Sequence, residues 1–213
     1  MDGRIVADAL LLVAAYLIGG IPSGVILARV VGGPDPRSVG SGRTGGANVA
    51  RALGPRVAIL TGALDVLKGA VAVVLARLVG GGLDVQVLAA LAAIVGHSRS
   101  PFIGLRGGRG VSPAYGGLLV IEPAIAVLMV PVFLVVFAVS RYSSLASLTA
   151  SAFAGVVVAG VGVITGQPVL YAYALGGAGL IWLFHHDNIA RLLAGTERRF
   201  GSPRPNRADP GAR

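Results

Sequence analysis

The chain has 213 residues, of which 54% are hydrophobic and only 13% are charged. Soluble domains carry about 25% charged residues, so this composition excludes a soluble enzyme, a disordered chain and a fibrous repeat. It predicts instead an all-α polytopic membrane protein. The net charge is +9 at pH 7, and the absence of cysteine excludes disulfides and thiolate chemistry.

Apolar stretches of membrane-helix length follow one another along the chain. In lipid each backbone polar group must be paired within its own segment, so such stretches are expected to be helices. The first is too long for a cleavable signal peptide and lacks a basic start. The stretches cover roughly residues 5–31, 57–79, 83–96, 122–139, 143–164 and 168–184.

The apolar segment 111–121 decides the number of membrane helices. It is too short to cross a bilayer upright, and joining it to 122–139 would give six helices. Glu122-Pro123 predicts a break instead, because proline favours the first turn of a new helix and a buried glutamate is costly. The break gives about seven helices.

The basic residues also favour seven helices. With the N-terminus outside, only Arg4 and Arg77 of the 18 Arg and Lys residues lie outside, where acidic residues outnumber them. This is the positive-inside pattern, so we expect the C-terminus in the cytoplasm. Residues 1–200 would form a single membrane-embedded domain, and residues 201–213 a disordered cytoplasmic tail.

Polar residues gather in three segments, all on the expected cytoplasmic side. They are Arg37 to Arg51, Gly96 to Gly110 and His185 to Phe200. Glycine lets backbone N–H groups approach an oxyanion, and arginine matches phosphate or carboxylate oxygens with two parallel hydrogen bonds. One such loop alone could be a tight turn with topology-setting arginines. Three on one face favour a shared phosphate-binding site.

Other motifs in these segments are weaker. Gly40, Gly42 and Gly45 spell G-x-G-x-x-G, but a dinucleotide site requires this motif between a strand and a helix. His185 and His186 are adjacent rather than one helical turn apart, so we expect no metal. No cofactor and no nucleic-acid partner are expected either.

Asp65 and Lys68 stand three residues apart in the expected second helix. A local ion pair that neutralises two costly groups is the simpler interpretation, and a supporting role near the site is the alternative.

The three polar segments contain motifs that resemble those of one enzyme family. The first motif is matched by Gly40, Ser41, Gly42, Gly45, Asn48 and Arg51. The second is matched by Gly96, His97, Gly107, Gly108, Gly110 and Val111. The third is matched by His185, Asn188, Ile189, Arg191, Leu192, Gly195 and Glu197. Over residues 10 to 200 the chain resembles the bacterial PlsY family of integral-membrane acyl-phosphate:glycerol-3-phosphate acyltransferases.

The sequence departs from the family pattern at several of these positions. Arg43 replaces an asparagine, and Gly46-Ala47 replaces Ala-Thr. Arg106 and Arg109 replace two lysines, which keeps the charge but changes the donor geometry. A family member with another acceptor, or without activity, is therefore one alternative.

The resemblance implies acyl transfer from acyl-phosphate to the sn-1 hydroxyl of glycerol 3-phosphate, with lysophosphatidic acid and phosphate as products. It further implies an acyltransferase domain in the bacterial inner membrane, in contact with lipid, with its active site facing the cytoplasm. An acyl-phosphate is already activated, so no covalent enzyme intermediate is required. The oligomeric state stays open.

The resemblance also implies roles for single residues. The residues expected to be catalytic are Ser41, Arg51, Asn188 and Glu197. The residues expected to bind substrate are Gly40, Gly42, Gly45, Asn48, His97, Arg106, Gly107, Gly108, Arg109, Gly110, His185 and Arg191. Ser41, Arg51 and Arg109 would hold the acyl-phosphate, Arg106, His185, Asn188 and Arg191 would hold glycerol 3-phosphate, and Glu197 would order the site.

A transporter for an organic phosphate is the alternative from a different class. It would place polar residues at mid-membrane depth, whereas here they gather on one face.

Overall fold

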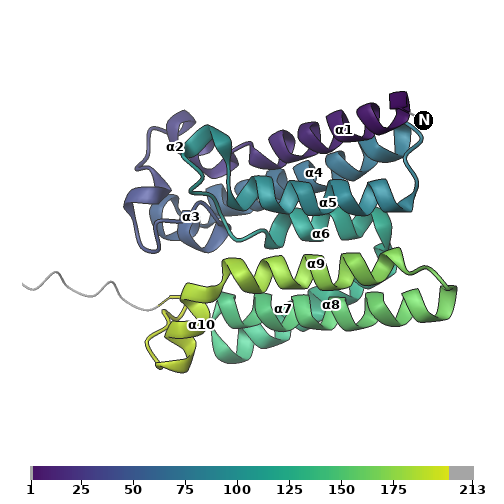
Figure 1. Cartoon of the computed structure of the whole chain (residues 1–213). Coiled ribbons are helices and arrows are strands. Elements are labelled where there is room, and N and C mark those ends of the chain that lie inside the picture. Colours follow the sequence, from purple (N-terminus) through teal and green to yellow (C-terminus); the bar gives the residue numbers. More distant parts are fainter. Residues whose placement is uncertain (1, 202–213) are drawn as a thin grey trace, which may run out of the picture.

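The computed structural model describes residues 2–201, which form helices joined by short loops and contain no β-strand. The long helices share one axis and alternate in direction (Figure 1). They are α1 (Asp2–Gly20), α4 (Pro55–Leu78), α5 (Leu83–Ser98), α6 (Val111–Ile121), α7 (Pro123–Ser140), α8 (Ser143–Thr165) and α9 (Val169–Phe184). The all-α prediction is confirmed.

Short helices gather at the end of the bundle that lies away from the N-terminus (Figure 1). They are α2 (Ser23–Val30), α3 (Gly46–Leu53) and α10 (His186–Leu193), with 3₁₀ turns at Pro36–Ser38 and Pro101–Ile103. The three polar segments belong to these helices and to the loops beside them. Their predicted position on one face therefore corresponds to one end of the bundle.

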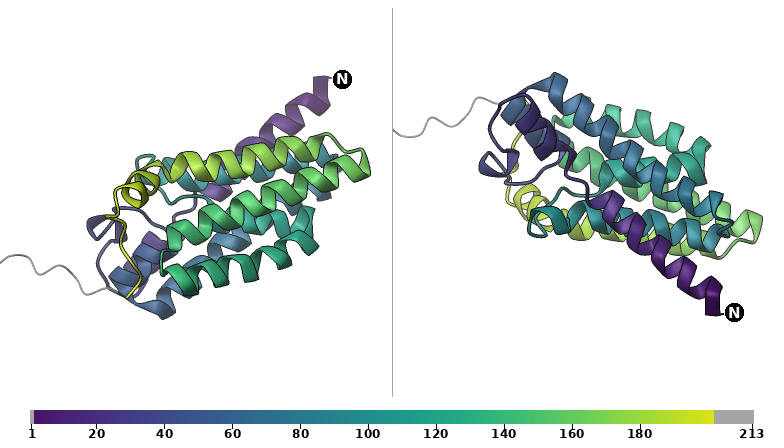
Figure 2. Two further views of the ribbon diagram at one scale, coloured as in Figure 1. Left: turned by 90° about the horizontal axis from the view of Figure 1, so that it is seen from below. Right: turned by 90° about the horizontal axis from the view of Figure 1, so that it is seen from above.

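The bundle is held together by close contacts between small residues. Helix α5 packs against α1, α4, α6 and α9, while α8 packs between α7 and α9 (Figure 2). A Cβ atom added to Gly96 would collide with the Tyr16 carbonyl, and one added to Gly116 would collide with the Val66 carbonyl. Such close backbone approach is typical of helix packing in membranes.

The break predicted at Glu122 is present. Helix α6 ends at Ile121 and α7 begins at Pro123, with Glu122 in a non-helical conformation between them. The continuous helix of the six-helix alternative is therefore wrong. By length and composition, the helices α1, α4, α7 and α8 can cross a membrane; they are the four such helices in residues 2–201.

The apolar stretch 5–31 does not form one helix, which corrects the prediction for that segment. Helix α1 ends at Gly20 and α2 begins at Ser23, because Pro22 has no N–H to continue the ladder. The Ile21 carbonyl at the break accepts hydrogen bonds from the Ser23 N–H over 3.0 Å and from the Lys68 ammonium group over 2.8 Å. A buried charged side chain thus stabilises the break.

The tail expected at 201–213 lies, apart from Gly201, outside the described residues.

Candidate active site

The first and third polar segments are joined directly by an ion pair. Arg43, in the loop before α3, donates to the Asp187 carboxylate of α10 over 3.1 Å. The two residues are separated by 144 positions in the chain. The loop between α5 and α6 contributes Arg109, whose charge is influenced by both of them. All three segments therefore meet at one end of the bundle.

Asn48 organises the first segment. Its buried side-chain amide donates to the carbonyls of Pro36, Val39 and Arg43 over 2.6, 3.0 and 2.8 Å. Its side-chain oxygen accepts the Ser41 N–H over 3.1 Å. Every polar atom of this side chain is therefore engaged with the loop, and Asn48 holds the shape of the segment on which Ser41 is exposed.

The glycines of the first segment serve this loop conformation. Gly40 has φ +60° and Gly42 has φ +67°, values that residues with a side chain rarely adopt. A Cβ atom on Gly40 would also collide with the side-chain oxygen of Asn48. Gly45 differs, because it precedes α3 with extended backbone and open space around it.

The second segment folds back against the end of α5. The N–H groups of Gly107 and Gly108 donate to the carbonyls of Ser98 and His97 over 3.2 and 3.1 Å. A Cβ atom on either glycine would collide with His97, which is buried. These two N–H groups are thus used within the protein, and His97 acts as the support for the loop.

Gly110 and Arg109 lie where this segment enters α6. Gly110 is buried in the left-handed conformation with φ +81° and precedes the first turn of α6, whose N–H groups have no partner within the helix. Burial lowers the pKa of the neighbouring Arg109 to about 10, with the charges of Arg43 and Arg191 adding to the effect. The Arg109 Nε is buried without a hydrogen-bond partner in residues 2–201. An anion bound here would relieve both costs.

Glu197 is the centre of the third segment. One carboxylate oxygen accepts from Asn188 over 2.7 Å and from Ser144 of α8 over 2.9 Å. The other accepts from Arg191 over 2.7 Å. Burial alone would raise the pKa of Glu197, but the hydrogen bonds from Arg191, Asn188 and Ser144 bring it below its ordinary value. Glu197 is therefore an ionised anchor and a weak base.

His185 joins α9 to α10 and is buried. Burial lowers its pKa to about 4, so the ring is neutral near pH 7. Its Nδ1 lies 2.8 Å from the Ile181 carbonyl, which can only accept, so Nδ1 carries the proton and donates. The Nε2 atom is then the acceptor nitrogen, and it can receive a hydrogen bond from a hydroxyl group.

The remaining site candidates, Arg51 and Arg106, lie at the margin of the site that the three polar segments form. Arg51 is partly buried on α3, and burial together with nearby Arg198 and Arg191 lowers its pKa. Arg106 is exposed and has no ion pair within the described residues, so the structure does not bring it into the cluster. Within residues 2–201 no group of three or more His, Asp or Glu residues could hold a metal ion.

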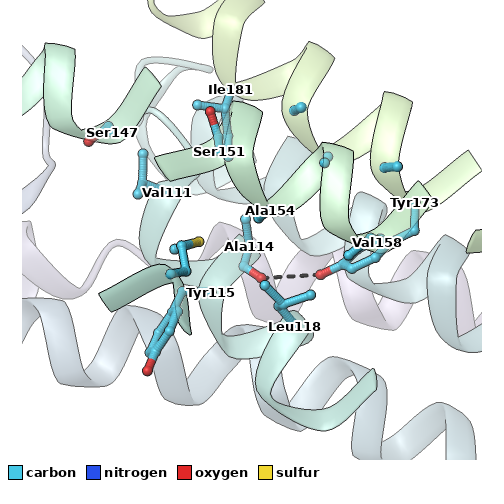
Figure 3. A pocket seen from close by; sticks show the side chains of 15 residues that line it. Val111, Ala114, Tyr115, Leu118, Ser147, Ser151, Ala154, Val158, Tyr173 and Ile181 are labelled. Carbon is cyan, nitrogen blue, oxygen red and sulfur yellow. Dashed lines mark hydrogen bonds between the residues drawn. The ribbon is translucent and has the colours of Figure 1, made fainter. Parts of the chain in front are cut away.

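An apolar pocket begins beside the cluster and continues between α6, α8 and α9 (Figure 3). Val111, the residue after Gly110, and Ile181, whose carbonyl binds His185, both line it. The space measures about 430 Å³, including the part that is open to the surroundings. Charged groups that suit phosphate therefore stand next to a space that suits a hydrocarbon chain.

Comparison with known proteins is consistent with this arrangement. A family model described as glycerol-3-phosphate acyltransferase matches residues 9–195. The chain belongs to this family. A glycerol-3-phosphate acyltransferase of Myxococcus xanthus is 44% identical over 193 residues, which cover 89% of this chain and 98% of the relative. One of Rubrobacter xylanophilus is 40% identical over 196 residues, covering 91% and 96%.

Two solved structures of the glycerol-3-phosphate acyltransferase PlsY (YgiH), an integral membrane protein, share the fold. Its glycerol 3-phosphate form has a TM-score of 0.83 and 37% identity, and the match covers 92% of this chain and 96% of that one. Its lysophosphatidic acid form has a TM-score of 0.81 with the same identity and coverage. This chain is accordingly a multi-pass membrane protein.

Four residues that the structure places in this cluster were not among the predicted site residues: Arg43, Asp187, Ser144 and Arg198. Arg43 was noted only as a departure from the family pattern, yet it links the first and third segments. Ser144 binds Glu197 from α8. Arg198 lies near Gly40 and Arg51. Arg198 directly follows the third motif, so its position in the sequence could have identified it as a site residue. The contacts of Arg43 and Ser144 depend on the tertiary fold and have no such signal.

Proposed function

We propose that this protein transfers a fatty acyl group from an acyl-phosphate to the sn-1 hydroxyl of glycerol 3-phosphate at the cytoplasmic face of a bacterial membrane. The products are lysophosphatidic acid and inorganic phosphate. The observation that carries the proposal is that the arginine cluster, formed by Arg43, Arg109 and Arg191, adjoins the apolar pocket. Family membership supports the same reaction, since the PlsY relative was solved in a glycerol 3-phosphate form and a lysophosphatidic acid form.

The arginines provide the electrostatic part of catalysis. Arg109 and the N-terminus of α6 bind the phosphate of the donor, and Arg51 adds a second positive charge. Positive groups that are already held in place stabilise the oxyanion that forms when the acyl carbonyl is attacked. Removing one such donor from an active site typically costs about 2.7–4 kcal/mol of transition-state stabilisation.

The proton balance follows from the basicity of three titratable groups at the site, His185, Asp187 and Glu197. The acceptor hydroxyl oxygen bonds to the acyl carbon, and the bond from that carbon to the bridging phosphate oxygen breaks. The phosphate leaves with the electron pair. His185, Asp187 and Glu197 all have a lowered pKa, whereas phosphate esters have a second pKa near 6. The departing phosphate is therefore the strongest base present and takes the hydroxyl proton, while His185 orients the hydroxyl through Nε2.

The reaction can be tested with purified protein, acyl-phosphate and labelled glycerol 3-phosphate. Labelled lysophosphatidic acid is the expected product, and a well-folded sample that forms none contradicts the proposal. Arg51→Ala and Asn188→Ala should each lower turnover sharply. Arg56→Ala is the matched control, because Arg56 is exposed at the start of α4 on the same end of the bundle. Normal rates in both site variants would refute the site.

Arg43 supports an acceptor screen beside this assay. It stands where the family has asparagine, and it is fixed beside α10 by its ion pair with Asp187. Other phosphorylated alcohols should be offered in place of glycerol 3-phosphate. Preference for one of them would identify a different acceptor within the same reaction class.

We further propose that α1 and α4 to α9 all cross the membrane, with the N-terminus outside. The alternation of their directions and the clustering of basic residues at one end support this topology. Because the chain lacks cysteine, single cysteines can report each side without background. A membrane-impermeant thiol reagent should label Gly3→Cys in intact cells and Ala194→Cys only after permeabilisation. The reverse pattern would refute the orientation.

A further inference from the structure

The apolar pocket has a defined far end, formed by Tyr173 of α9 (Figure 3). The buried Tyr173 donates its hydroxyl to the Ala114 carbonyl of α6 over 3.2 Å, so the side chain reaches from one wall of the pocket to another. Gly117 leaves room for this contact, since a Cβ atom there would lie 3.2 Å from the Tyr173 hydroxyl. A directional hydrogen bond therefore fixes the ring across the pocket.

We propose that Tyr173 determines the acyl-chain length that this enzyme accepts. The carbonyl end of the chain lies at the mouth beside Val111 and Ile181, and the methyl end rests against the Tyr173 ring. This inference depends on the proposed acyl transfer and adds a specificity-determining residue to it. The occupant is an acyl chain attached to a phosphate-bearing head, as in the donor or the product.

The pocket walls suit a hydrocarbon chain. Most of the lining side chains are aliphatic or alanine. The two serines in the α8 wall satisfy their own helix, because Ser147 donates to the Ser143 carbonyl over 2.8 Å and Ser151 to the Leu148 carbonyl over 3.0 Å. The hydroxyl groups of these two serines are therefore already engaged within α8.

The position of the mouth identifies the head of the guest. Ile181 is bound to His185, and Ser147 lies less than one turn after Ser144, which binds Glu197. α8 and α9 thus contribute both to the charged cluster and to the pocket wall. An occupant with a phosphate at one end and a chain at the other fits this continuity.

The helix geometry gives the length of the site. The α8 wall runs from Ser147 to Val158, which corresponds to ~16 Å at about 1.5 Å per residue. The α9 wall from Ile181 to Tyr173 corresponds to ~12 Å on the same basis. An extended alkyl chain advances ~1.3 Å per carbon, given C–C bonds of about 1.5 Å. Along the α9 wall, which carries Tyr173, the pocket therefore holds roughly nine carbons before the chain meets the ring.

The side chains around the Tyr173 ring are apolar. Leu118 and Val158, which also line the pocket, and Leu170 are buried in the same hydrophobic cluster as Tyr173. Removing the ring therefore lengthens an apolar space and takes away the hydroxyl donor of the Ala114 carbonyl. A larger side chain at Gly177 should shorten the pocket instead. Gly177 lines the pocket, and a Cβ atom there meets only the Tyr173 ring, at 4.0 Å.

Two variants should shift the preferred acyl-chain length in opposite directions, and a third variant on the same helix is the control. Tyr173→Ala should favour longer chains, because each additional buried methylene favours binding about fourfold. Gly177→Leu should favour shorter chains, because its side chain enters the pocket. Gly179→Leu is the matched control, as Gly179 is exposed with open space around it. Tyr173→Phe keeps the ring and should stay within about twofold of wild type.

The measurement is kcat/KM for a series of acyl-phosphates of 8 to 16 carbons, expressed as the ratio of the 14-carbon to the 10-carbon donor. Tyr173→Ala should raise this ratio by about tenfold or more, and Gly177→Leu should lower it by a similar factor. Unchanged ratios in both variants, with normal thermal unfolding, would overturn the role of Tyr173. Opposite shifts cannot arise from general destabilisation, which lowers all rates together.

A second measurement does not depend on turnover. Non-hydrolysable acyl phosphonates of the same chain lengths should raise the unfolding temperature, with the optimum length displaced upward in Tyr173→Ala and downward in Gly177→Leu. If wild type makes no lysophosphatidic acid but these optima move, the proposed reaction fails and the chain-length role stands. If lysophosphatidic acid forms and the optima coincide in all variants, the chain-length role fails alone.

Discussion

Two buried carboxylates in this protein are neutralised in different ways. Asp65 lies within α4, and its partner Lys68 stands on the same helix, with an ion-pair distance of 2.8 Å. The side chains of both are less than a tenth exposed. Glu197 follows the last helix, and its partners come from α8 and α10. One carboxylate is satisfied by local sequence, whereas the other requires the assembled fold.

The surroundings of the two carboxylates assign them different tasks. Lys68 also binds the Ile21 carbonyl, and Asp65 lies 3.7 Å from the ring of His97. The Asp65 group therefore joins the helix break to α4 and α5 and serves the bundle. Glu197 orients Asn188 and Arg191, which face the arginine cluster, and so serves the site. Changes at Asp65 should lower stability, and changes at Glu197 should lower activity.

The largest effect is expected at Asp65. Asp65→Ala leaves the buried Lys68 charge without its partner, which should cost about 3–5 kcal/mol of stability. Thermal unfolding in detergent measures this loss. The double variant Asp65→Leu/Lys68→Met should recover most of it, since both charges are then gone. Asp84→Ala at an exposed carboxylate should be nearly neutral. If Asp65→Ala unfolds at the wild-type temperature, Asp65 does not stabilise the bundle and the two carboxylates do not differ in this way.

Glu197→Gln should affect turnover more than folding. The amide can still accept from Ser144 and Asn188, but it presents no charge to Arg191. Hydrogen bonds to charged groups contribute about 1.5–3 kcal/mol, so turnover should fall roughly ten- to hundredfold. Initial rates of lysophosphatidic acid formation measure this. An unfolding temperature that falls as far as in Asp65→Ala would show that Glu197 also serves the bundle.

Ser144→Ala removes one neutral hydrogen bond to Glu197 and leaves the other two. The loss of about 1 kcal/mol corresponds to roughly a fivefold lower rate. Thr165→Ala is the control, because the exposed Thr165 hydroxyl is bonded only within α8 and lies outside the pocket lining. Equal rates for the two variants would show that α8 takes no part in ordering Glu197.

The smallest effect concerns acid stability. The pKa of Glu197 lies below its ordinary value of 4.5 in the folded protein, so its contribution is present above pH 4.5 and is lost as pH falls through the folded value. Glu197→Gln lacks this contribution at every pH. The difference in unfolding temperature between wild type and Glu197→Gln should therefore narrow between pH 7 and pH 3. A difference that widens in acid would show that the ionised Glu197 does not stabilise the folded protein.

Hydropathy and proline predicted most of the helices but not the first break. The stretch 5–31 is apolar throughout, so composition favoured one helix across Pro22. Proline disrupts the helical hydrogen bonds at Pro22 and at Pro123, but the break was predicted only at Pro123. Two of the groups that bind carbonyls at the break are distant in sequence: Lys68 donates to Ile21, 47 positions away, and Ser100 donates to Gly20, 80 positions away. No local pattern reports which distant side chain will cap a freed carbonyl.

The glycines show a similar limit of prediction from sequence. The sequence suggested that Gly107 and Gly108 expose N–H groups to an anion, yet both N–H groups bond to the end of α5. Close contact with His97 already requires glycine at both positions. Composition identifies where backbone must approach something closely. It does not say whether the neighbour is a ligand or another part of the chain, because that depends on how the helices are assembled.

The segment before α6 folds back into the end of the bundle. Gly110 lies against Ile94, four residues before the end of α5, or ~6 Å inside the bundle. Arg109 is thereby carried inward, two residues before Val111 on the wall of the apolar pocket. In the proposed reaction, a donor phosphate bound there leaves its chain among apolar side chains. Each methylene kept out of water contributes about 0.8 kcal/mol, so the inward position of the phosphate site favours binding of the whole acyl chain.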